Sequence, residues 1–84
     1  MSDIQRGSIV RTKSPVYFNK YTDKGELRRI LTRDSGEIGE VQEIQEILDG
    51  IVIVAFDKPD FYFLTNISYY DKDELELISR GRRY

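Results

Sequence analysis

The stretch Ile51-Val52-Ile53-Val54-Ala55-Phe56 decides the fold class of this chain. All of its residues are apolar and most are β-branched, which is typical of a buried β-strand. The dipeptide Asp49-Gly50 before it is a favourable turn signal, and Asp57-Lys58-Pro59-Asp60 closes it. The sequence therefore predicts a central strand between two turns.

Further short strands are expected on both sides of this run. Gly7–Lys13 contains β-branched residues and precedes Pro15, which ends a strand or marks a sheet edge. Glu74–Ile78 alternates charged and apolar residues, which suits a last strand. Several short strands joined by turns in 84 residues predict a small β-barrel. We expect a single domain over residues 1–84, with an ordered core of about 5–78 and a basic tail, 79–84.

Two segments are ambiguous. In residues 20–35, Asp23 and Glu26 resemble a capping box, and three apolar residues follow at helical spacing: Leu27, Ile30 and Leu31. A short helical segment or a long ordered loop fits this stretch equally well. In Glu37–Leu48, the apolar residues suit one helix face, whereas Gly39 opposes a helix. The residue pattern slightly favours a helix here.

The composition excludes several classes of chemistry. With 39% hydrophobic and 33% charged residues, the chain resembles a soluble globular protein. It has no cysteine and no histidine, which excludes disulfides, thiol chemistry, Cys/His zinc sites and imidazole catalysis. The glycines are isolated, so no phosphate-binding loop is visible. We expect no secretory signal, no enzyme, and no catalytic, cofactor-binding or metal site.

The formal charge of −2 conceals a strong asymmetry. Residues 1–33 have a net charge of +5, residues 34–78 have −10, and the tail 79–84 has +3. Such asymmetry is a hint about binding partners, although folding can also interleave the segments and neutralise their charges.

Aromatic residues are plentiful, and most of them lie in the acidic part of the chain: Tyr17, Phe18, Tyr21, Phe56, Phe61, Tyr62, Phe63, Tyr69 and Tyr70. Interleaved with Lys and Arg, they could stack the bases of single-stranded nucleic acid; otherwise they belong to the core of a small β domain. Because the basic residues lie mostly in the first third, the two groups are separated in sequence. We therefore do not expect a nucleic-acid partner.

An ordered set of motifs resembles the photosystem I reaction centre subunit IV (PsaE) family. The matching pieces cover most of the chain apart from residues 20–36: Gln5–Arg11, Ser14–Asn19, Glu37–Val41, Ile51–Lys58, Phe61, Thr65-Asn66 and Asp73–Leu75. The resemblance implies an all-β fold, a small five-stranded SH3-like barrel with a long inserted loop, or one helical turn, between strands 1 and 2. It also implies a strand, not a helix, from Glu37 to Ile44.

The resemblance further implies a non-catalytic accessory subunit of photosynthetic electron transport, without a cofactor or small-molecule substrate. Such a subunit lies peripherally on the cytoplasmic or stromal face of the thylakoid membrane, bound through protein contacts to the photosystem I core or a related complex. It assists the docking of ferredoxin or flavodoxin. Because ferredoxins are acidic, Lys and Arg would steer the encounter.

Six basic residues are candidates for this docking. Arg6, Arg11 and Lys58 occupy positions in the matching motifs, and Lys13, Arg28 and Arg29 add to the basic first third. Ala55, however, stands where the family usually has a basic residue, and the 34–78 segment is acidic.

Two alternatives remain open. The variable chain of ferredoxin–thioredoxin reductase has a similar barrel and a longer stretch before a strand like Gly36-Glu37-Ile38. A stand-alone cytoplasmic SH3-like adaptor that binds peptide or nucleic acid is the other.

Overall fold

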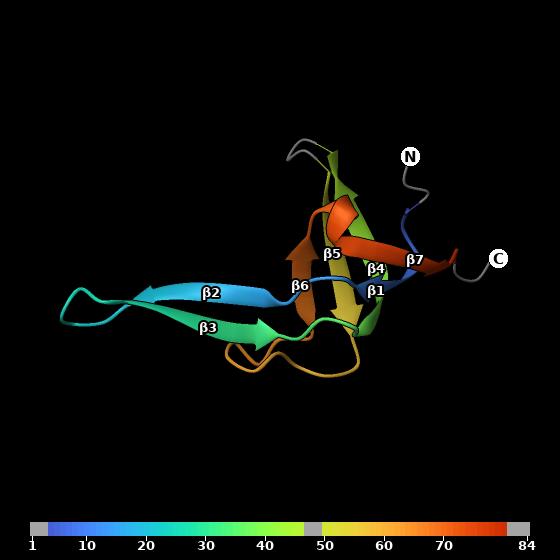
Figure 1. Ribbon diagram of the computed structural model, residues 1–84. Helices are drawn as coiled ribbons and strands as arrows, with labels where there is room; N and C mark the ends of the chain where they lie inside the picture. The colour runs from blue at the N-terminus through green and yellow to red at the C-terminus, as the bar shows by residue number, and fades with distance from the viewer. Residues whose placement is uncertain (1–3, 47–49, 81–84) are drawn as a thin grey trace.

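The fold consists of two antiparallel β-sheets (Figure 1). The structure, a computed structural model, describes residues 4–46 and 50–80. The elements in this part of the chain are β1 (Ile9–Thr12), β2 (Val16–Tyr21), β3 (Leu27–Arg33), β4 (Ile38–Gln45), β5 (Ile51–Phe56), β6 (Ile67–Tyr70), the 3-10 turn η2 (Lys72–Glu74) and β7 (Leu75–Ser79). This described part contains no helix with the length and apolar character needed to span a bilayer. The expected all-β class is confirmed.

The larger sheet has five strands in the order β6-β5-β4-β1-β7. β1 lies between β4 and β7, so the first and last strands of the described chain pair with each other in this sheet. Register shifts interrupt two of the pairings, one between Ile9 and Val10 and one between Val41 and Glu43. Such bulges bend and twist a sheet, which lets its inner face curve around a small core.

The inner face of this sheet forms the core. Alternate residues of each strand point inward, and the buried apolar side chains are Ile4, Val10, Val41, Val52, Val54, Phe56, Tyr70 and Leu75. Gly39 faces the same core, where a Cβ atom would lie 2.6 Å from Val54 Cγ1 and 2.7 Å from the Ala55 carbonyl oxygen. Burial raises the pKa of the Tyr70 hydroxyl to about 12.

The smaller sheet is a hairpin of β2 and β3, here called the arm (Val16–Arg33). It leaves the five-stranded sheet sideways and gives the molecule its length of 52 Å against 27 and 17 Å in the other directions (Figure 1). At its tip Glu26 closes the turn, because its N–H donates to Thr22 Oγ1 and its carbonyl oxygen accepts from the Thr22 N–H. Gly25 supplies the positive φ of +79° that this turn needs.

The arm corrects the prediction of a loop or helical turn in residues 20–35. The three apolar residues at helical spacing are divided between the two faces of the hairpin. Leu27 lies opposite Tyr21 and Leu31 opposite Tyr17, whereas Ile30 lies opposite Phe18. These aromatic–aliphatic cross-strand pairs stabilise a hairpin, and they override the local helical pattern.

The helix slightly favoured for Glu37–Leu48 is also wrong. Ile38–Gln45 forms β4, close to the strand Glu37–Ile44 that the family resemblance implies. β4 pairs on one side with β1 and on the other with β5, so its backbone hydrogen bonds are made between strands. Leu48 lies outside the described residues.

The remaining expectations have mixed outcomes. Ile51–Phe56 is β5 as predicted, and strands are confirmed within Gly7–Lys13 and Glu74–Ile78. Strand β6 was not expected. Of the tail assigned to residues 79–84, Ser79 belongs to β7, and residues 81–84 lie outside the described part.

Candidate docking surface

The connection between β5 and β6 presents a row of apolar side chains to solvent. Phe61, Tyr62, Phe63 and Leu64 follow one another, and their exposed fractions are 60%, 38%, 55% and 72%. Apolar side chains scattered singly on a surface need no explanation, but four in sequence on one loop form a patch. Such patches mark binding sites on soluble proteins.

The buried carboxylate of Asp60 holds this loop in place. Its Oδ1 accepts hydrogen bonds from the backbone N–H groups of Tyr62, Phe63 and Leu64, at 2.9, 2.6 and 3.0 Å. Burial alone would raise the pKa of Asp60, but these three donors and the charge of Arg33 outweigh it and hold the pKa below the ordinary 3.8. The chain then passes through Leu64 with a φ of 58°, a conformation that costs energy for a residue with a side chain.

The buried side chain of Arg33 connects the same loop to both sheets. Its side chain is only 1% exposed and lies over the Phe56 ring, 4.1 Å from the ring centre. The guanidinium donates to four acceptors: Ser68 Oγ, Glu37 Oε1 and the carbonyl oxygens of Lys58 and Thr65. A buried guanidinium with this many partners is compensated for its desolvation, and it fixes β3, β6 and both ends of the loop relative to one another.

The base of the arm completes the patch. The ring of Phe18 stacks on Tyr62, with 5.4 Å between ring centres, and meets the edge of Phe63 at 5.0 Å. Lys20 Nζ donates to the Tyr62 hydroxyl at 3.4 Å. We call this cluster the aromatic surface, and its residues are Phe18, Lys20, Phe61, Tyr62, Phe63 and Leu64.

Basic and aromatic residues that are far apart in sequence are therefore neighbours in space. Besides Lys20 and Tyr62, the Arg33 guanidinium lies 4.1 Å from the centre of the Phe56 ring. The separation of the two groups in sequence does not keep them apart in space, because the arm brings them together. Several ring faces are nonetheless occupied by one another or by cations, which leaves little room for stacked bases.

The six basic residues predicted to dock a partner do not converge on one place. Arg6, Arg11 and Lys13 lie on or beside β1, and Arg11 is paired with Glu76 at 3.2 Å. Arg28 and Arg29 are exposed on the arm. Lys58 lies in the connection between β5 and β6, before Phe61–Leu64 in the chain.

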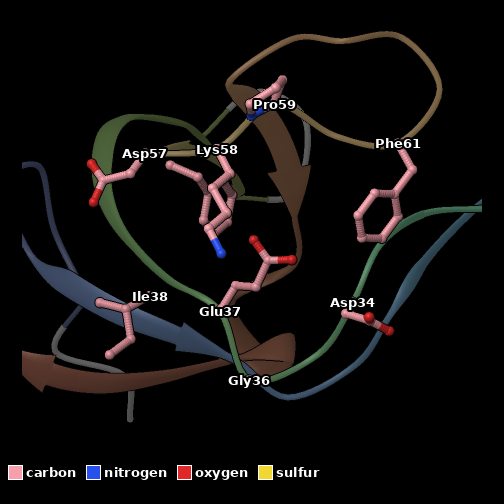
Figure 2. A pocket seen from close by; sticks show the side chains of 9 residues that line it. Asp34, Gly36, Glu37, Ile38, Asp57, Lys58, Pro59 and Phe61 are labelled. Atoms are coloured by element: carbon pink, nitrogen blue, oxygen red, sulfur yellow. The ribbon is translucent and has the colours of Figure 1, made fainter.

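A pocket of about 540 Å³ lies beside the loop (Figure 2). It is lined by Asp34, Gly36, Glu37, Ile38, Phe56, Asp57, Lys58, Pro59 and Phe61. The side chains of Glu37 and Lys58 both point into it, and the ring of Phe61 forms part of its rim (Figure 2). Within residues 4–46 and 50–80, no cluster of three or more acidic side chains is arranged to hold a metal ion.

Sequence reasoning missed the residues that position this surface. Arg33 was only one of several cations in a basic stretch, and Asp60 was only the end of a turn. The available signal was Phe61–Leu64 itself, an apolar run between two turn signals that no strand pairing requires.

Comparisons of the chain with protein-family models, with curated proteins and with solved structures give no match.

Proposed function

We propose that this chain is a non-catalytic docking module that binds a larger protein through its aromatic surface. The observation that carries the proposal is the exposed row Phe61–Leu64 on a loop fixed by Asp60 and Arg33. A surface held in one conformation loses little entropy on binding, and aromatic anchors beside a cation are the typical energetic centre of protein interfaces.

The strand connectivity supports an SH3-like barrel as the scaffold of this module. When the arm is set aside, the five strands of the larger sheet follow one another as a meander, and the last strand returns to pair with the first. This is the connectivity by which a short meander closes on itself and limits its open edges. The short turn η2 before the last strand makes this return compact.

For the setting of this module, we propose an accessory role in photosynthetic electron transport, on the strength of the motif resemblance to the PsaE family. The exposed cations of the arm would favour an acidic protein such as ferredoxin or flavodoxin. A titration with ferredoxin at about 50 mM and about 500 mM salt tests this step, because charge steering weakens with ionic strength. Binding that is indifferent to salt would count against it.

Affinity capture from thylakoid membranes tests the proposal as a whole. The immobilised full chain is compared with a Tyr62→Ser/Phe63→Ser variant and with Tyr69→Ser, which removes an aromatic that is 65% exposed on another surface. We expect the wild type and Tyr69→Ser to retain reaction-centre subunits and the double variant to lose them. Capture of proteins that include no reaction-centre subunit contradicts the photosystem I setting. Capture of a thioredoxin-reducing iron–sulfur subunit instead supports the variable-chain alternative. Equal capture by all three proteins contradicts the role of the aromatic surface.

A further inference from the structure

The outer face of the five-stranded sheet is unusually apolar for a surface. Every residue of β5 from Ile51 to Phe56 is apolar, although only one face of the strand packs on the core. In antiparallel sheets with one solvated face, polar residues normally alternate with apolar ones. The apolar side chains of this outer face are exposed or half-buried: Ile9, Ile38, Ile51, Ile53, Ala55, Ile67, Tyr69 and Ile78. The described part of the chain therefore leaves this face partly open to solvent.

The outer face is also acidic. Glu40 lies opposite Ile9 and Ala55, and Glu43 lies opposite Ile53, so both carboxylates stand among the apolar side chains. Neither forms a salt bridge within residues 4–46 and 50–80, whereas Arg11 on this face is already paired with Glu76. A partner for this face needs apolar area and positive charge.

The arm has both properties. Tyr17, Tyr21 and Leu27 are 41%, 69% and 57% exposed on it. Four cations are exposed along the arm against the two carboxylates of Asp23 and Glu26: Lys20, Lys24, Arg28 and Arg29. None of these four forms a salt bridge with another described residue.

The arm cannot serve its own sheet, because it extends away from it (Figure 1). It is also a hairpin of only two strands that packs on the rest of the molecule at its base, through residues such as Val16 and Phe18, and isolated two-stranded hairpins are marginally stable in water. One molecule thus carries an apolar, basic projection and an apolar, acidic face that it cannot bring together. A second molecule offers the complement to each.

We propose that the arm of one copy packs on the outer sheet face of a second copy, and that the exchange is reciprocal. A two-fold arrangement covers both faces and both arms and leaves no open end for further copies to add. The cations of the arm lie against Glu40 and Glu43 of the other copy. Apart from Lys20, the residues of this interface lie outside the aromatic surface, and its existence does not depend on the docking function proposed above.

Sedimentation velocity of the full chain over a range of concentrations tests this proposal. We expect a dimer whose dissociation constant rises about tenfold or more between about 50 mM and about 500 mM salt. Two charge-reversed variants, Arg28→Glu/Arg29→Glu on the arm and Glu40→Lys/Glu43→Lys on the face, are each expected to be monomeric. The Phe61→Ser/Leu64→Ser variant is the matched control, because it changes the aromatic surface but keeps the two rings that pack on Phe18 of the arm, and it is expected to dimerise like the wild type.

Mixing the two charge-reversed variants gives the decisive result. In the mixture each reversed arm meets a face of opposite charge, so we expect a heterodimer to form. Misfolding of either variant could not produce this rescue. Three results for the charged groups would overturn the proposal: a wild type that stays monomeric at all concentrations, dimerisation that survives both reversals, or a mixture that remains monomeric. It would also be overturned if the control variant lost dimerisation while both charge-reversed variants kept it.

Discussion

At the scale of single residues, Arg33 has the largest expected effect. An Arg33→Met substitution would remove the guanidinium that donates to four acceptors, and it would leave the Glu37 carboxylate without its cation. Breaking a buried pair in this way costs about 3 kcal/mol of unfolding free energy. Urea unfolding measures the loss, with the exposed Lys13→Met substitution as control, for which we expect a change within about 0.5 kcal/mol. Similar values for both variants would show that the Arg33 network does not stabilise the fold.

Asp60 lowers the free energy of unfolding in acid relative to neutral pH. Its folded pKa lies below the ordinary 3.8, so its ionised form stabilises the folded state above that pH, and the contribution is lost as the pH falls through the folded pKa. We expect Asp60→Asn to be less stable than the wild type at neutral pH and the difference to shrink in acid. Unfolding curves at several pH values measure it, and Asp57→Asn on the same loop is the control at neutral pH. A difference that stays constant or grows in acid would contradict this assignment.

Neither residue could have been identified from the sequence. The partners of Arg33 lie 4 to 35 positions away along the chain, so only the folded loop reveals that they converge. Asp60 bonds to the residues that directly follow it, but the local sequence shows a turn and not the burial of the carboxylate.

At the scale of elements, Gly39 allows β4 to pack closely on β5. A Gly39→Ala substitution would place a Cβ atom against the backbone and side chains of β5 and force the two strands apart. Such overpacking costs about 2 kcal/mol of unfolding free energy. The exposed Ser35→Ala substitution serves as control, and thermal and urea unfolding of both variants provide the measurement. A Gly39→Ala variant as stable as the wild type would mean that β4 packs less closely on β5 than the structure indicates.

The elements also show which patterns can be interpreted from sequence. The β5 run has no polar residue and turn signals at both ends, so one interpretation fits. The β4 segment and the arm place apolar residues at spacings that suit a helix, and only cross-strand partners decide the outcome. For the arm these partners are the aromatic residues of β2.

At the scale of the whole molecule, the near-zero net charge combines a basic arm with an acidic sheet face. The sequence revealed the two charge blocks, but not that the arm separates them in space or that its base joins the aromatic loop. The aromatic surface and the outer sheet face depend on contacts between distant segments, for which local pattern contains no information.

The equilibrium affinity for a protein captured by this chain tests the central claim most directly. Isothermal titration compares the wild type with the Tyr62→Ser/Phe63→Ser variant, after circular dichroism has confirmed that both fold alike. We expect the variant to bind at least about 30-fold more weakly, the ratio that corresponds to one interface hot spot of about 2 kcal/mol. Equal affinities for the two proteins would show that the aromatic surface is not where the partner binds.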